Sequence, residues 1–225
     1  MIVIYRITSK ISVNPSPIFN DDKAKLNEVC LKSFRQAFRE VNPKVIFLAD
    51  KCTIETDDMI KRVIPFEYEI IHTDLGQNDS ALKQWEMALN QDEDILFQEC
   101  DYIWREKVGK EFVDGLNTLG LVSPYDHLNF YIDRTLHSNQ VTIELVGDTH
   151  WRSTERNCLT FAIKNQIFKD NYEIFKKYGY LDGDTWYELL AKGHPLYVPI
   201  PSMATHMVRG YLAPSVDWEK IWLKL

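Results

Sequence analysis

The sequence contains few cysteines, and none of them stands in a metal-binding or disulfide pattern. The four, among 225 residues, are Cys30, Cys52, Cys100 and Cys158, and no two of them form a C-x-x-C pair. Structural zinc sites and disulfide frameworks depend on cysteines at short, paired spacings. The spacing therefore indicates neither kind of site. It favours a reducing compartment, which we expect to be the cytoplasm.

Long apolar runs and an excess of basic residues are also missing. No stretch approaches the roughly 18 consecutive apolar residues of a membrane-spanning helix, and the short apolar start lacks the basic flank of a signal peptide. Acidic residues outnumber basic ones by 33 to 26, for a net charge of −7. This charge disfavours nucleic acid as a partner, because nucleic-acid binding relies on a broad basic surface. A single diphosphate stays compatible with it, because a metal and a few local donors suffice.

What the first half does contain is a regular alternation of apolar strands and amphipathic helices. Apolar, β-branched runs predict buried strands, and apolar residues at helical spacing predict the helices between them. The predicted strands span residues 2–5, 45–49, 67–72 and 94–98, and the predicted helices span residues 23–40, 56–63 and 78–89. Three successive strand–helix–strand units predict an α/β fold with a mainly parallel central sheet flanked by helices.

The second half of the sequence is less regular. Its predicted helices span residues 108–119, 166–178, 185–191 and 216–223, its predicted strands span residues 141–146, 159–163 and 196–198, and residues 148–155 and 200–206 are predicted loops. No repeat, low-complexity tract or linker separates the two halves. Together with the length and ordinary globular composition, this predicts one domain over residues 1–225.

An acidic pair directly follows one of the buried strands. In open α/β sheets ligands bind beyond the carboxyl ends of the strands, where Arg6, Asp50 and the pair Glu99 and Asp101 are predicted to lie. Two carboxylates two residues apart on an extended backbone point the same way. Such a pair offers the oxygen ligands that magnesium and manganese prefer beside a diphosphate. The alternative is that one carboxylate caps the next helix and the other is solvated.

These features resemble the GT-A fold glycosyltransferases, in particular those of family two, whose D-x-D motif holds the metal of the nucleotide-sugar diphosphate. The motif stands here as Glu99-Cys100-Asp101, with a departure at its first position that keeps the charge. The resemblance implies a nucleotide-binding half over about residues 1–104 and an acceptor-binding half over about residues 105–225. It also implies Mn²⁺ or Mg²⁺ at Glu99 and Asp101, and nucleotide contacts from Arg6, Asp50, Asn78 and Cys100.

A late acidic segment, Asp182-Gly183-Asp184, resembles the segment that carries the catalytic carboxylate of family-two transferases. The resemblance implies that Asp184, or failing it Asp182, removes the proton of the acceptor hydroxyl in an inverting reaction. The alternative is a helix N-cap before Thr185. The resemblance likewise implies that His206 completes the metal shell, whereas a lone histidine is also a common structural hydrogen-bonder. No Gln-x-x-Arg-Trp motif of the processive synthases is present, which indicates single addition.

Two further segments carry candidate sugar contacts. Tyr102 and Trp104 follow the acidic pair, and Trp151 and Arg152 lie in the predicted loop over residues 148–155. Sugars are commonly bound by aromatic faces and by bidentate polar side chains. The alternative for the second segment is a packed loop in which Trp151 fills the core.

The sequence therefore predicts a metal-dependent transferase that moves a hexose from a nucleoside-diphosphate sugar to a glycan or other hydroxyl acceptor. A nucleotidyltransferase is an alternative, although the segment 6–20 lacks the glycine-rich loop typical of that class. A glycosidase would also use two carboxylates but needs no nucleotide. A non-catalytic nucleotide or sugar binder of the same fold is the remaining alternative, because Glu99 replaces aspartate and fold does not guarantee function.

Overall fold

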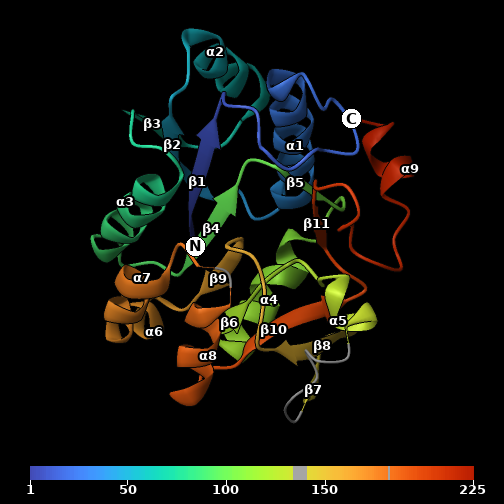
Figure 1. The fold of residues 1–225 in the computed structure, drawn as a ribbon. Coiled ribbons are helices and arrows are strands. Elements are labelled where there is room, and N and C mark those ends of the chain that lie inside the picture. Colours follow the sequence, from blue (N-terminus) through green and yellow to red (C-terminus); the bar gives the residue numbers. More distant parts are fainter. Residues whose placement is uncertain (134–140, 182) are drawn as a thin grey trace.

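The computed structural model describes residues 1–133, 141–181 and 183–225, and these form one large sheet flanked by helices (Figure 1). The order of the strands in the large sheet is β3-β2-β1-β4-β9-β6-β10-β8-β7. Its strands are β1 (Ile2–Thr8), β2 (Lys44–Asp50), β3 (Tyr68–Thr73), β4 (Ile95–Glu99), β6 (Leu121–Val122), β7 (Ile143–Val146), β8 (Thr149–Thr154), β9 (Phe161–Ile163) and β10 (Leu196–Ile200). Two more strands, β5 (Tyr102–Trp104) and β11 (Ala204–His206), pair in a separate small sheet.

The helices connect these strands and cover both faces of the large sheet. They are α1 (Lys23–Phe38), α2 (Ile54–Val63), α3 (Gln77–Leu89), α4 (Gly109–Leu119), α5 (Asn129–Ile132), α6 (Asn165–Asp170), α7 (Tyr172–Tyr178), α8 (Asp184–Ala191) and α9 (Trp218–Trp222). None of the helices in the described part of the chain is long and apolar enough to cross a membrane.

The first half has the predicted parallel arrangement. Strands β3, β2, β1 and β4 run parallel to one another, and each predicted strand and helix of this half is present within a few residues of its expected bounds. Because the strands are parallel and in register, Thr8 pairs with Asp50 and Arg6 pairs with Glu99 at their carboxyl ends. The polar residues after these strands therefore share one edge of the sheet.

Successive side chains of β1 enter two different cores. Val3, Tyr5 and Ile7 pack with α1, α2 and α4, whereas Ile2 and Ile4 pack with α3 and with the helices α6 to α8. A strand exposes alternate residues to opposite faces, so a run that is apolar at every position must be covered on both sides. This explains why β1, β2 and β4 read as continuous apolar segments.

The second half differs from its prediction in several places, including the unpredicted β6 and α5. The predicted loop over residues 148–155 is mostly strand β8, which pairs antiparallel with β7 and β10. The predicted loop over residues 200–206 ends in strand β11. The single helix predicted over residues 166–178 is two helices, α6 and α7, which meet at Asn171. Asn171 leaves the helical conformation, with φ −117° and ψ 17°.

The small sheet brings the end of the chain to the acidic motif. Strand β5 begins just after Asp101, and β11 pairs with it antiparallel, so that His206 lies opposite Tyr102. The backbone N–H of Met207 donates to the carbonyl of Asp101 over 2.7 Å. Residues from the start, middle and end of the sequence thus meet at the carboxyl edge of β1 and β4.

Candidate functional site

Arg6 and Glu99 form an ion pair at the carboxyl ends of β1 and β4. The guanidinium Nη2 lies 2.5 Å from Glu99 Oε1, and only 10% and 20% of the two side chains are exposed. Arg6 Nη1 donates to the carbonyl of Gln77 over 2.8 Å and to Ser80 Oγ over 3.4 Å. Arg6 therefore connects β1, β4 and the first turn of α3, and both of its terminal nitrogens already have partners.

Asp101 and His206 form a second charged pair beside the first. Nε2 of His206 lies 3.4 Å from Asp101 Oδ2, and each side chain is 21% exposed. Burial alone would lower the pKa of His206, but the Asp101 carboxylate outweighs it and holds that pKa well above its ordinary value. Burial alone would raise the pKa of Asp101, but His206 and Lys23 outweigh it and hold that pKa low. The pair is therefore an imidazolium and a carboxylate.

The ring of His206 is fixed on its other sides as well. It stacks on Tyr102 with ring centroids 4.9 Å apart and an interplanar angle of 5°. Its Nδ1 lies 3.7 Å from the Sγ of Cys158, so both ring nitrogens face polar neighbours. Nearby His127 has its pKa lowered to about 4 by burial and by the positive charge of His206. Of these two histidines, His206 therefore carries the positive charge at neutral pH.

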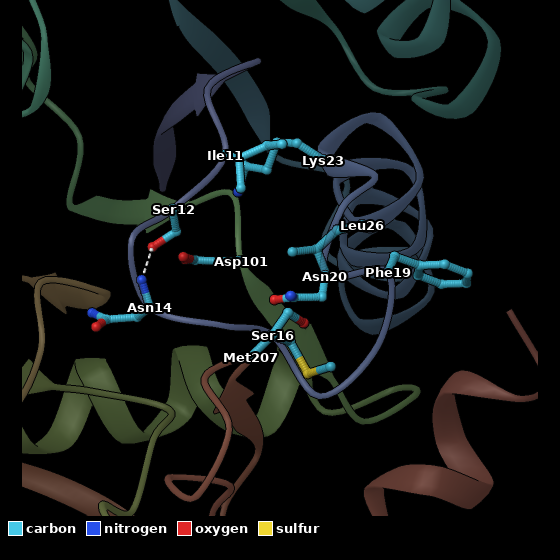
Figure 2. A pocket seen from close by; sticks show the side chains of 10 residues that line it. All are labelled: Ile11, Ser12, Asn14, Ser16, Phe19, Asn20, Lys23, Leu26, Asp101 and Met207. Carbon is cyan, nitrogen blue, oxygen red and sulfur yellow. Dashed lines mark hydrogen bonds between the residues drawn. The ribbon is translucent and has the colours of Figure 1, made fainter.

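A buried lysine lies on the other side of Asp101. Lys23 begins α1 and is only 8% exposed. Burial alone would lower the pKa of its ammonium, but Cys100 and Asp101 raise it above the ordinary value. Lys23 and Asp101 line one small pocket, which is covered by the loop between β1 and α1 (Figure 2). The pocket has a volume of about 10 Å³, which is room for about one water molecule.

Asp50 organises the loop that follows β3. It is 4% exposed, and its carboxylate accepts hydrogen bonds from Thr73 Oγ1 and from the backbone N–H groups of Leu75 and Gly76 over 2.7 to 2.9 Å. Gly76 has φ +91°, a conformation that L side chains rarely adopt. Asp50 thus holds the loop at the carboxyl edge, and Asn78 lies exposed in the first turn of α3 beyond it.

The four predicted sugar contacts are buried. Tyr102, Trp104 and Trp151 are each at most 1% exposed, and the indole N–H of Trp104 donates to Gln98 Oε1 over 3.0 Å. Arg152 is paired with the buried Asp126, with Nη2 2.6 Å from Oδ1. These side chains shape the core behind the edge and have no free surface toward a sugar.

The predicted catalytic carboxylates Asp182 and Asp184 are far from the acidic motif in the sequence. The helix that carries Asp184 is connected to the motif by a series of side-chain contacts. Asp184 is exposed in the first turn of α8. Trp186 of the same helix donates its indole N–H to the carbonyl of Asn157 over 2.6 Å, and Asn157 directly precedes Cys158, which contacts His206. Asp182 lies outside the described residues.

The predicted metal ligands do not form a ready cation site. Within the described ranges, no group of three or more His, Cys, Asp and Glu side chains is placed to hold a metal ion. Asp101 and His206 lie together, but Glu99 is paired with Arg6. Because both carboxylates already face protein cations, the residues as arranged do not fit magnesium or manganese.

Sequence reasoning missed two residues of this group, Lys23 and Cys158. Lys23 lies at i, i+3 and i+7 spacing with Leu26 and Cys30, which places it on the buried face of α1. This spacing predicts from the sequence that Lys23 lies on the buried face of the helix. No comparable signal marks Cys158, because its position beside His206 depends on the pairing of β11 with β5.

The fold is shared with solved transferases. Similar structures include the galactosyltransferase LgtC in complex with donor and acceptor sugar analogs, at 10% sequence identity and a TM-score of 0.51, covering 88% of this chain and 73% of that one. They also include the 4-diphosphocytidyl-2C-methyl-D-erythritol synthase of Anaerococcus prevotii, at 13% identity and a TM-score of 0.53, covering 98% and 93%. The inositol-1-phosphate CTP transferase of T. maritima matches at 8% identity and a TM-score of 0.54, covering 99% and 95%.

Comparison with protein-family models and with curated proteins gives no match. The structural likeness therefore establishes the fold alone, a GT-A-like α/β domain. It confirms the predicted fold class.

Proposed function

We propose that the protein is a glycosyltransferase that takes a sugar from a nucleoside-diphosphate sugar and passes it to a hydroxyl acceptor in a single addition. The observation that carries this proposal is the meeting of Asp101 and His206, 3.4 Å apart, directly beside the Arg6–Glu99 pair. These groups lie at the carboxyl ends of β1 and β4, where open α/β sheets bind their ligands. Preorganised charged groups at such an edge suit an anionic leaving group.

In this reaction the acceptor oxygen forms a bond to the anomeric carbon while the bond from that carbon to the diphosphate oxygen breaks. The acceptor hydroxyl gives its proton to a carboxylate, for which we propose Asp184, because it is exposed and its helix is linked to the site through Trp186. The nucleoside diphosphate leaves with the bonding electrons. The imidazolium of His206 is placed to offset the charge that then develops.

For the nucleotide we propose the loop held by Asp50, with Asn78 and Cys100 close to the same edge. Asp50 acts by fixing the loop, since its carboxylate is already occupied by three donors. No step is assigned to a metal, because Glu99 and Asp101 face protein cations. The dependence on Mn²⁺ or Mg²⁺ that the resemblance implies stays a prediction.

A second candidate function is nucleotidyl transfer, in which a phosphate or hydroxyl acceptor attacks a nucleoside triphosphate and pyrophosphate leaves. One observation favours it: the two cytidylyl-type enzymes match almost the whole length of both chains, whereas LgtC is covered over 73% of its length. Both reactions need an anion site at the same edge.

Product analysis separates the two functions. The protein is incubated with nucleotide sugars of uridine, guanosine, adenosine and cytidine plus a mixture of hydroxyl acceptors, and in parallel with the four nucleoside triphosphates plus sugar phosphates. Mass spectrometry then identifies the products. Acceptor-dependent release of a nucleoside diphosphate supports glycosyl transfer, and release of pyrophosphate supports nucleotidyl transfer. If neither product forms under any condition, both proposals are wrong.

A further inference from the structure

A large cavity lies between the N-terminal halves of α1 and α2. It has a volume of about 570 Å³ and is completed by Ser9, which follows β1. Sites for small molecules typically have volumes of about 300–1,000 Å³. Helices α1 and α2 cover one face of the large sheet, whereas the side chain of Arg6 contacts α3 on the other face (Figure 1). The cavity is therefore separate from the site at the acidic motif.

Asn27 brings an unpaired hydrogen-bond acceptor to the wall of this cavity. The residue is 2% exposed, and its Nδ2 donates to the carbonyl of Thr8 over 2.9 Å, which fixes the orientation of the amide. Within the described ranges, its Oδ1 has no hydrogen-bond partner. Buried polar atoms are nearly always paired, either with the protein or with a bound molecule. A ligand that satisfies Asn27 must therefore carry an N–H or O–H donor.

Two hydroxyl groups lie in the same wall. Ser9 Oγ and Thr56 Oγ1 are 3.1 Å apart, and either one can donate to the other. A hydroxyl has one donor and two acceptor positions, so this pair keeps hydrogen-bonding capacity for a ligand. Met59, which is 6% exposed, adds an apolar surface to the cavity. The wall thus suits a ligand that both donates and accepts hydrogen bonds.

The charged side chains of the cavity nearly balance. Arg62 Nη2 lies 3.1 Å from Glu28 Oε2, which leaves Lys25 against the exposed carboxylates of Asp22 and Glu55. Asp22 caps α1 and Glu55 lies in the first turn of α2, where the positive ends of the helix dipoles offset negative charge. The cavity therefore favours neither a strong anion nor a strong cation.

We propose that this cavity is a binding site for a neutral, hydroxyl-rich ligand, namely a sugar. A sugar hydroxyl can donate to Asn27 Oδ1, and others can bond to the hydroxyls of Ser9 and Thr56 and to the carboxylates of the rim. A fully ionised phosphate has no donor for Asn27, and an ammonium group would meet Lys25. The inference does not depend on the proposed function, because the cavity lies on the other face of the sheet.

Amide NMR of the isotope-labelled protein tests the proposal in the absence of nucleotide. The probes are glucose, galactose, mannose, N-acetylglucosamine, lactose and maltose at millimolar concentrations. We expect at least one of them to shift the signals of Ser9, Asn27 and Thr56 in a saturable way. Ala24→Trp should abolish these shifts, because Ala24 is an exposed residue of the cavity lining. Ala191→Trp is the matched control, since Ala191 is an exposed alanine at the end of α8.

Asn27→Leu tests the unpaired acceptor itself. It keeps a side chain of similar size but removes Oδ1, so we expect the sugar to bind about threefold to tenfold more weakly. This variant also removes the bond to Thr8. If it does not fold, Ala24→Trp still decides the question, because its position is exposed.

The remaining outcomes would overturn the proposal. The site is wrong if none of the sugars shifts the signals of Ser9, Asn27 and Thr56, or if Ala24→Trp leaves the shifts as they are. The ligand class is wrong if inorganic phosphate or spermidine shifts these signals and the sugars do not. None of these results bears on glycosyl transfer, which the product analysis decides on its own.

Discussion

His206 Nε2 lies 3.4 Å from Asp101 Oδ2, although Asp101 lies in the middle of the sequence and His206 near its end. The antiparallel pairing of β5 with β11 places them together, and stacking on Tyr102 fixes the imidazole ring. Two short strands thus bring His206 to the acidic motif Glu99-Cys100-Asp101.

The Asp101–His206 pair predicts a pH-dependent stability. The pKa of His206 is raised above its ordinary 6.5, so its contribution is fully present below pH 6.5 and is lost as pH rises through the raised value. The pKa of Asp101 is lowered below its ordinary 3.8, so its contribution is present above pH 3.8 and is lost as pH falls through the lowered value. Both contributions are fully present between pH 3.8 and pH 6.5, so the pair stabilises the fold most in that range.

We expect His206→Gln to lower the free energy of unfolding more at about pH 6 than at about pH 9, because the stabilisation from the imidazolium decreases as pH rises above 6.5. Urea unfolding of the wild type and the variant at both pH values measures the difference. His150→Gln serves as control, because His150 is exposed on β8. A loss of stability that is the same at both pH values would show that the pair is not charged in the folded protein.

The Arg6–Glu99 pair predicts a coupled loss of stability. Removing either partner leaves a mostly buried charge, so Arg6→Met and Glu99→Gln should each lower the free energy of unfolding by about 1–3 kcal/mol. The double variant should lose less than the sum of the two, because it leaves neither charge unpaired. Chemical denaturation of the three variants gives the coupling energy. Strictly additive losses would contradict the ion pair.

Asp50 should be a stability residue as well as a nucleotide-site residue. Asp50→Ala removes the acceptor of three hydrogen bonds and leaves the N–H groups of Leu75 and Gly76 without it, so we expect a loss of about 2–4 kcal/mol. Thr73→Val removes only one of the three and should cost about 1 kcal/mol. Thermal unfolding measures both. If the alanine variant melts like the wild type, Asp50 does not hold the loop.

The buried pair of Arg152 with Asp126 predicts a structural role for Arg152. The two side chains are only 5% and 2% exposed, and the Arg152 guanidinium also lies 3.3 Å from the centroid of the Phe130 ring. Asp126→Asn should therefore cost about 3–5 kcal/mol, because it leaves a buried arginine unpaired. Replacing both residues, as Asp126→Leu with Arg152→Met, should restore part of the loss. A direct substrate role would instead lower activity and leave stability unchanged.

Much of the first half of the fold could be predicted from the sequence. Strands β1, β2 and β4 are buried on both faces, and such strands appear as unbroken apolar runs, while α1 and α3 show apolar stripes at helical spacing. These patterns are local. The carboxyl edge and the residues Arg6, Asp50, Glu99 and Asp101 on it follow from them, because parallel strands in register end together.

The second half and the surroundings of the site could not be predicted in the same way. Strands β5, β6 and β11 have two or three residues each, which is too short for a periodicity to appear. Trp151 and Arg152 form a mixed polar and aromatic segment that reads as a loop, yet both are buried by pairing with β10 and by an ion pair with Asp126. Long-range pairing decides such residues, and a single sequence does not display it.

Hydrogen exchange with bound nucleotide tests the central claim most directly. Amide hydrogen exchange is measured for the protein alone and with whichever of UDP, GDP, ADP and CDP raises its melting temperature most, since a ligand that binds the native state stabilises it. We expect slower exchange in the segments that contain Arg6, Lys23, Asp101 and His206, with no change in β7 and β8. Protection confined to β7 and β8, or no protection by any of the four nucleotides, would contradict a nucleotide site at this edge.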